Sequence, residues 1–180
     1  MADTSTTTTA ITNTGAPGAT LSDPRVVRAI ELLWHEADLL DRKEYRAWNE
    51  LYAEDGIYVI PLDPTTEDFD DQLNMVYDDA RMRAMRVARL TEGYAIAAVD
   101  SARTARTVSR FVPVETTDGS VSLRAAQVLV AYKRGRHQLW AGDVEFTVRF
   151  GADRSEDRIV RKVIRLVDAE DAVPAAGFLL

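Results

Sequence analysis

Residues 103–150 decide the fold, and their sequence is RTARTVSRFVPVETTDGSVSLRAAQVLVAYKRGRHQLWAGDVEFTVRF. Many β-branched and aromatic residues in this stretch alternate with polar ones, which is typical of β-strands. Asp118-Gly119 and Gly135 interrupt the pattern, and an Asp-Gly pair is a strong signal for a hairpin turn. The pattern therefore predicts three long strands in an antiparallel meander, over 103–115, 120–134 and 136–150.

The residues before this stretch favour helices. Asp23 or Ser22 can cap a helix that begins with Pro24, because proline at the first helical position loses no needed donor. Apolar residues after Pro24 follow helical spacing to about Asp41. Four further elements are predicted: a short helix over 44–52, a strand over 57–60, a helix over 73–90 and a long strand over 158–168.

Helices that precede a long antiparallel meander indicate an α+β fold. Strands of ten or more residues exceed the usual ~5–6 residues, and sheets of long strands usually curl. We therefore predict a cone-shaped, strongly curved and mostly antiparallel sheet, with the N-terminal helices packed on its concave face. A cavity inside such a cone is the default site for a small molecule.

The chain has 180 residues, which is the length of one domain. Its first 20 residues are rich in threonine and lack periodic apolar positions, so they cannot offset the entropy cost of ordering. We predict a disordered tail over 1–20 and a single domain over 21–180. Because no apolar run approaches the ~18–20 residues of a membrane span, we expect no membrane contact. The absence of cysteine fits a cytoplasmic location, which we also expect.

Composition limits the chemistry that this chain can perform. It contains no cysteine and two histidines, His35 and His137. These numbers exclude a thiolate nucleophile, an iron–sulfur cluster with cysteine ligands and a three-histidine metal site. The 29 acidic residues exceed the 22 basic ones, giving a formal net charge of -7, which argues against a nucleic-acid partner.

One group of residues could carry out acid–base catalysis. His35 lies on the first predicted helix, where Asp38 or Asp41 could orient it as a general base, with Tyr58 as an electrophilic donor. A helix histidine that bonds to a neighbour or packs at an interface explains the same residues. If the catalytic interpretation holds, the chain is a stand-alone isomerase or dehydratase. A small-ligand-binding homo-oligomer is a further alternative, and an open or a filled interior would discriminate between these hypotheses.

Arginines recur within two of the long predicted strands. Strand alternation places Arg106, Arg110 and Val112 on one face of the first, and Arg161 and Arg165 on one face of the last. Charged residues are costly to bury without a partner. The pattern therefore predicts that another chain covers one face of the sheet.

Several motifs follow one another along the chain: a helix with His-Glu-Ala, a short helix with tryptophan, a Tyr-Asp-Asp segment, a Ser-Arg-Thr-x-Arg strand and an apolar terminus. In this order they resemble the small (beta) subunit of bacterial aromatic-ring-hydroxylating dioxygenases. The resemblance covers about residues 22–180. The matching segments are 31–62 (ELLWHEADLLDRKEYRAWNELYAEDGIYVIPL), 76–90 (VYDDARMRAMRVARL), 101–111 (SARTARTVSRF), 158–168 (RIVRKVIRLVD) and 178–180 (FLL).

The resemblance implies a nuclear-transport-factor-2-like (cystatin-like) fold and a complex of three small with three large (alpha) subunits. It implies that the alpha subunit carries a Rieske iron–sulfur cluster and a mononuclear iron, while the small subunit is structural and non-catalytic. The cysteine count agrees independently, because a Rieske centre needs two cysteines and two histidines. We thus expect no cofactor or metal in this chain. The predicted subunit contacts are Arg103, Arg106, Arg161, Arg165, Phe178, Leu179 and Leu180.

Overall fold

The computed structural model describes residues 20–92, 102–169 and 177–180. The tail predicted to be disordered lies, apart from Thr20, outside these residues. The described elements are α1 (Pro24–Asp41), α2 (Tyr45–Glu50), β1 (Tyr52–Pro61), β2 (Asn74–Asp78), α3 (Ala80–Thr91), β3 (Arg103–Thr116), β4 (Ser120–Lys133), β5 (Arg136–Arg149), the 3-10 helix η1 (Arg154–Glu156) and β6 (Arg158–Leu166).

The described strands form one sheet in the order β2-β1-β6-β5-β4-β3. Neighbouring strands are antiparallel except β1 and β6, which run parallel. The register of β4 with β5 runs without a shift from Ser120 to Lys133. Arg134 and Gly135 between these strands both have positive φ, as the two central residues of a type I′ hairpin turn require. The predicted α+β class and the antiparallel meander are therefore confirmed.

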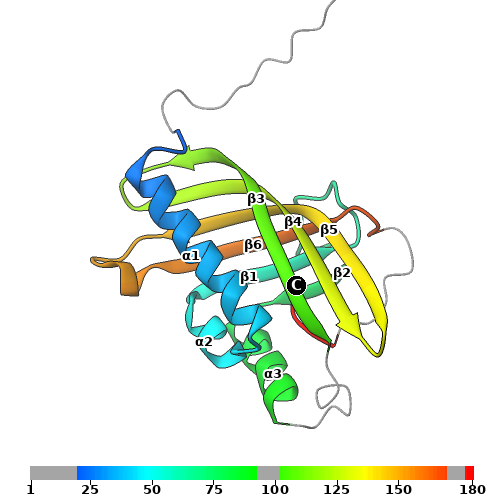
Figure 1. Ribbon diagram of the computed structural model, residues 1–180. Helices are drawn as coiled ribbons and strands as arrows, with labels where there is room; N and C mark the ends of the chain where they lie inside the picture. The colour runs from blue at the N-terminus through cyan, green and yellow to red at the C-terminus, as the bar shows by residue number, and fades with distance from the viewer. Residues whose placement is uncertain (1–19, 93–101, 170–176) are drawn as a thin grey trace, which may run out of the picture.

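Helix α1 covers one face of this sheet and packs mainly against β3 (Figure 1). The Asp23 side chain caps the helix by accepting a hydrogen bond from the Arg25 backbone N at 2.9 Å. The helix buries the face that carries Ala29, Leu33 and Leu40, as the apolar spacing predicts. This packing places the C-terminal half of α1 over the interior of the fold.

The prediction of one helix over 73–90 is wrong at its beginning. Residues 74–78 form strand β2, which pairs with β1. Helix α3 begins only after Asp79, whose side chain accepts a hydrogen bond from the Met82 backbone N at 2.7 Å. An N-cap residue has extended backbone geometry, so the helix cannot continue toward the N-terminus through it. The pairing with β1 then decides the strand conformation before Asp79.

The predicted alternation along β3 is also wrong after Ser109. The register with β4 shifts between Ser109 and Val112, and Arg110 has a φ of 54°. This β-bulge inserts extra chain into one strand and reverses which side chains face inward. As a result, Phe111 packs against the core, whereas Val112 is exposed and does not share the face of Arg106.

Candidate functional site

A buried ion pair between Lys162 and Glu36 lies in the interior of the fold. The interior is also where a small-molecule site is expected if the cone is open. The Lys162 Nζ on β6 donates a hydrogen bond to the Glu36 Oε1 on α1 at 2.7 Å, and both side chains are fully buried. The Trp48 Nε1 donates to the same oxygen at 2.7 Å. Burial lowers the pKa of Lys162, and the charge of Glu36 opposes that effect. The pair thus joins α1, α2 and β6 across the core.

The last residues of the chain lie against this ion pair. Lys162 also donates a hydrogen bond to the Leu180 carbonyl oxygen at 3.1 Å. The Tyr58 hydroxyl on β1 lies 3.2 Å from both the backbone N and the carbonyl oxygen of Leu180. The Phe178 ring packs edge-on against Trp140 on β5 at a centroid distance of 6.0 Å. The C-terminal tripeptide therefore occupies the interior of its own subunit.

Arg106 holds the same segment from β3. Its side chain is 1% exposed, and its Nε donates to the Asp41 Oδ1 at the end of α1 at 2.9 Å. Its Nη2 donates to the Leu179 carbonyl oxygen at 3.1 Å. Among the predicted contact residues, Arg106, Phe178, Leu179 and Leu180 are thus buried within this chain, and their contact with another subunit stays a prediction.

The arginines of β6 are paired within the chain, contrary to the reasoning that led to the prediction of a covering partner. Arg165 donates from Nε to Glu145 at 3.0 Å and from Nη2 to Glu67 at 2.7 Å. The Arg161 Nη2 lies 3.3 Å from a carboxylate oxygen of each glutamate. Glu67 comes from the loop between β1 and β2, whose place on the sheet is not visible in local sequence patterns.

The four residues of the catalytic hypothesis do not come together. His35 is exposed on α1, whereas Tyr58 is 1% exposed and bonded to Leu180. Asp38 pairs with Arg42 at 3.1 Å on the surface of the same helix. Asp41 binds Arg106, as described above. Trp48, Lys162 and the C-terminal tripeptide are instead buried together, and large side chains in the interior are what the structural-subunit hypothesis predicts.

Glu36 and Lys162 were not singled out as site residues by the sequence analysis. Two patterns could have found them. Glu36 lies three residues after the buried Leu33 and four before the buried Leu40, so helical spacing places it on the apolar face of α1. Strand alternation places Lys162 on the face of β6 opposite Arg161. Opposite charges at two inward positions predict a buried pair.

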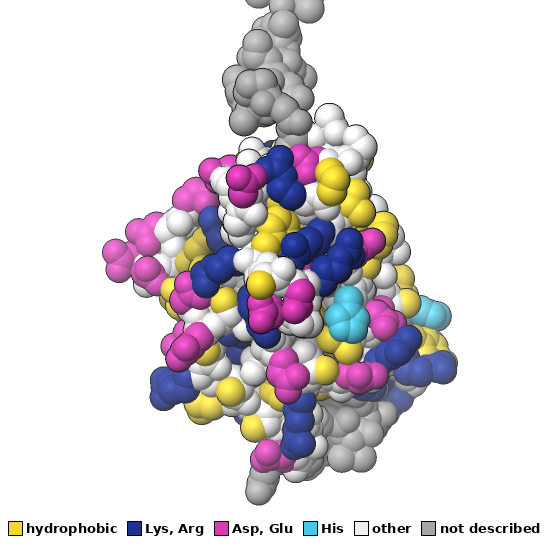
Figure 2. Space-filling model, turned by 90° about the vertical axis from the view of Figure 1, so that its left-hand side faces the viewer, with side chains coloured by type: hydrophobic (Ala, Val, Ile, Leu, Met, Phe, Trp, Pro, Cys, Tyr) yellow, Lys and Arg dark blue, Asp and Glu magenta, His cyan; other side chains and the backbone are white. Residues whose placement is uncertain are grey.

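Within residues 20–92, 102–169 and 177–180, no three His, Asp or Glu side chains are grouped to hold a metal ion. Likewise, no helix in the described part of the chain is long and apolar enough to cross a membrane. The side of the molecule where α1 and the β5–β6 connection lie carries charges of both signs side by side (Figure 2). Ion pairs on this side include Arg28 with Asp157 at 2.6 Å. Neighbouring opposite charges leave this side without a large field of one sign.

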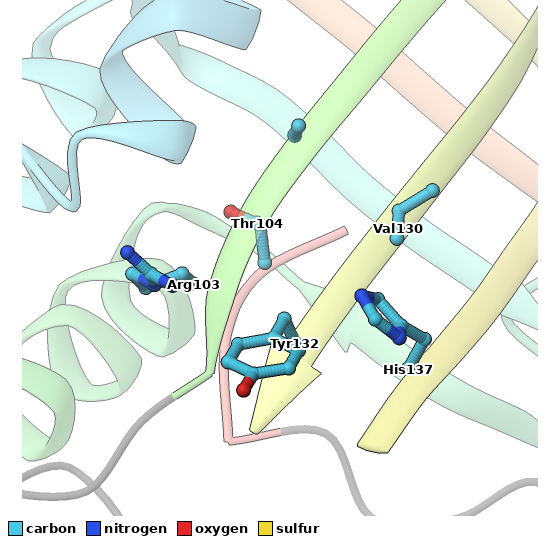
Figure 3. Close-up of a pocket in the computed structure, with 6 residues that line it drawn as sticks. Arg103, Thr104, Val130, Tyr132 and His137 are labelled. Atoms are coloured by element: carbon cyan, nitrogen blue, oxygen red, sulfur yellow. The ribbon is translucent and has the colours of Figure 1, made fainter. Parts of the chain in front are cut away.

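A shallow pocket of about 380 Å³ opens on the outer face of the sheet, at the ends of β3, β4 and β5. Figure 3 shows Arg103, Tyr132 and His137 along one row across these strands. The Arg103 guanidinium lies 5.4 Å from the centre of the Tyr132 ring, and the His137 ring lies 4.9 Å from it. Arg103 and His137 are exposed and Tyr132 is half-buried, so the row combines positive charge with aromatic surface.

Tyr52 supports a prediction about alkaline stability. Its buried hydroxyl has no hydrogen-bond partner within the described chain, and burial raises its pKa well above 10.0. In the unfolded chain the phenol ionises near pH 10 while the folded phenol keeps its proton, so stability falls as pH rises above 10. We expect Tyr52→Phe to raise the free energy of unfolding by about 1 kcal/mol at pH 7 and to weaken the loss above pH 10.

Urea unfolding at pH 7 and at pH 10–11 measures both effects. Tyr58→Phe is the matched comparison, because burial also raises the pKa of Tyr58. That variant should weaken the alkaline loss too, but it should lose stability at pH 7, since its hydroxyl binds Leu180. A clear loss of stability in Tyr52→Phe at pH 7 would contradict the assignment of an unpaired hydroxyl.

Comparison with known proteins gives a consistent result. Residues 35–170 match the family described as "Ring hydroxylating beta subunit". The small oxygenase component of the p-cumate 2,3-dioxygenase system of Pseudomonas putida is 31% identical over 121 residues, which are 66% of this chain and 67% of that protein. The beta subunit of toluate 1,2-dioxygenase from the same organism is 30% identical over 99 residues, covering 52% of this chain and 61% of that one.

Solved structures share the fold. The benzoate 1,2-dioxygenase beta subunit from Burkholderia mallei superposes with a TM-score of 0.69 at 21% identity, covering 87% of this chain and 97% of that chain. An NTF2-like protein with a cystatin-like fold from Novosphingobium aromaticivorans has a TM-score of 0.54 at 17% identity, covering 87% and 96%. These likenesses confirm the nuclear-transport-factor-2-like fold that the sequence resemblance implies.

Proposed function

Because the chain belongs to the ring-hydroxylating beta subunit family, we propose that it is the non-catalytic small subunit of an aromatic-ring-hydroxylating dioxygenase in aromatic hydrocarbon catabolism. The family match over residues 35–170 carries this proposal. The buried contacts of the interior support it, since Lys162 and Trp48 both bond to Glu36 and Lys162 also bonds to Leu180. The subunit then contributes shape and docking surface to its alpha partner.

The proposed complex contains three alpha and three beta subunits in the cytoplasm. The residues of this chain do not fit a Rieske cluster, which needs two cysteines and two histidines, because the chain has no cysteine. We therefore propose that the alpha subunit holds the Rieske cluster, and the family resemblance implies that it holds the mononuclear iron as well. The interface in such an obligate complex should exceed ~2,000 Å².

The predicted contact residues take two roles in this proposal. Arg103 and Arg161 keep accessible side chains and are proposed to touch a neighbouring subunit. Arg106, Arg165 and the residues 178–180 are buried or nearly so, and we propose that they hold the docking surface in shape from beneath.

Co-expression with the large-subunit gene from the same gene cluster tests the proposal. We expect a mixed complex with equal numbers of both subunits and visible absorption from the alpha subunit. The chain purified alone should be colourless and should oxidise no arene. Within the complex, His35→Ala should leave turnover unchanged, because His35 lies exposed on α1. Persistent failure to co-purify, or iron held tightly by the chain alone, would overturn the proposal.

A further inference from the structure

The outer face of the meander carries exposed apolar side chains with a basic border. Val130 on β4 and Leu139 on β5 are cross-strand partners, and their side chains are 38% and 65% exposed. Next to them lies the row of Arg103, Tyr132 and His137 (Figure 3), followed by the cationic end of the β4–β5 hairpin. We name this area the basic surface, and it comprises Arg103, Val128, Val130, Arg136, His137 and Leu139.

A second exposed apolar cluster has an acidic border. It lies on β2 and on the connection between β1 and β2, where Leu73 is 78% exposed and Leu62 is 39% exposed. Asp70 accepts a hydrogen bond from the Tyr77 hydroxyl at 2.7 Å, which raises the pKa of Tyr77. We name this area the acidic surface, and it comprises Leu62, Asp68, Asp70, Asp71, Leu73 and Tyr77.

The structure holds the acidic surface rigidly. Phe69 from the same connection is buried against Val59 and Val163 on the outer side of the sheet. Arg165 donates hydrogen bonds to the backbone oxygens of Pro64 and Thr66 at 2.9 and 2.6 Å. A loop fixed in this way loses little conformational entropy when it docks. Its aspartates are therefore presented as a preformed surface.

We propose that the basic surface of one copy of this chain docks on the acidic surface of a second copy. The two surfaces carry opposite charges, and each combines these with exposed apolar side chains, as interfaces commonly do. Strands β1 and β6 lie between β2 and β5 in the sheet, so the two surfaces are separated within one copy and pair between copies.

A second copy is the occupant that the charges favour. The chain has a net charge of -7, so random contacts between copies are repulsive, whereas this pairing places cations on carboxylates. Two different patches form a head-to-tail contact, and such contacts generate a closed ring when the rotation between copies closes. The inference rests on the proposed function, because the pairing would be the contact between neighbouring beta subunits in the proposed complex.

Charge exchange in the full-length chain tests the pairing. Arg103→Glu with Arg136→Glu reverses the basic surface, and Asp68→Lys with Asp71→Lys reverses the acidic one. Each double variant should weaken self-association at least 10-fold, as measured by sedimentation velocity and native mass spectrometry. The variant with all four substitutions should recover it, because the complementary charges are then exchanged. In the wild-type chain the association should weaken as salt is raised.

Arg46→Glu with Arg81→Glu is the matched control, since both side chains are exposed and lie on α2 and α3, outside both surfaces. It should keep the wild-type mass, and a loss equal to that of the surface variants would overturn the pairing. Circular dichroism checks that each variant is folded. If a charge reversal does not fold, the neutral substitution Arg136→Gln is used for the basic surface and Asp71→Asn for the acidic surface. A fourfold variant that fails to recover association, although folded, would also overturn the proposal.

Capture by a tagged alpha subunit is measured on the same variants to separate the two proposals. If self-association persists while capture is lost, the basic and acidic surfaces face the alpha subunit and the inference is wrong. If the charge exchange behaves as expected but no alpha subunit is captured, the pairing stands and the proposed function fails. A wild-type chain that is monomeric both alone and with the alpha subunit would overturn the pairing.

Discussion

Replacing Lys162 with methionine is expected to lower the free energy of unfolding by about 3–5 kcal/mol. The substitution leaves Glu36 fully buried without the ammonium group that compensates its charge. Trp48 would remain as a donor to Glu36, and one neutral hydrogen bond cannot offset the desolvation of a carboxylate. The loss would be measured by urea unfolding followed by circular dichroism at pH 7.

The double variant Lys162→Met with Glu36→Leu provides the sharper test. Replacing a buried ion pair with apolar residues of similar volume is often neutral or stabilising, so this variant should recover much of the lost stability. Arg154→Met is the control, because it breaks an exposed ion pair with Glu31 and should change stability by less than about 1 kcal/mol. If Lys162→Met behaves like this control, the interior is hydrated and the account of a filled core is wrong.

Phe178→Ala is the second substitution with a large expected effect, a loss of about 3–5 kcal/mol in the free energy of unfolding. The Phe178 side chain is 8% exposed and packs against Trp140, so its removal leaves a cavity in the core. Urea unfolding would measure the loss, and tryptophan fluorescence would report the changed surroundings of Trp140. Because domains are stable by only about 5–15 kcal/mol, a chain that ends at Gly177 should be largely unfolded.

Val167→Ala is the control for this prediction. Val167 is 80% exposed just after β6, so its truncation should change stability by no more than about 0.5 kcal/mol. Equal effects of the two substitutions would mean that residues 178–180 do not dock in the interior in solution. In that case the Tyr58 hydroxyl and Lys162 would lose the Leu180 backbone as a partner.

The filled interior explains how this fold serves as a structural subunit. In an open cone, a buried lysine beside a carboxylate and a tyrosine hydroxyl would be candidates for acid–base chemistry. Here Lys162 donates hydrogen bonds to Glu36 and to the Leu180 carbonyl oxygen, and the Tyr58 hydroxyl also bonds to Leu180. The same contacts join α1, β1 and β6 to the end of the chain. A rigid subunit is a suitable support for the docking surfaces of a complex.

Local sequence patterns predicted most of the regular elements of this protein, with β2 as the main exception. Helix α1 and the strands β3 to β6 lie close to their predicted positions, because helical spacing, strand alternation and turn residues act within a few neighbouring residues. The absence of cysteine and the ordered family motifs likewise followed from the sequence, and the absence of cysteine excludes a Rieske cluster held by this chain.

Only the tertiary structure decided which charged side chains pair with one another. Glu36 and Lys162 are 126 residues apart, and Glu67 reaches Arg165 over 98 residues. Strand β2 and the bulge at Arg110 also depend on pairing with neighbouring strands. The physical reason is that desolvation and ion pairing depend on which distant segments meet, and a periodic pattern specifies a face but not what packs against it.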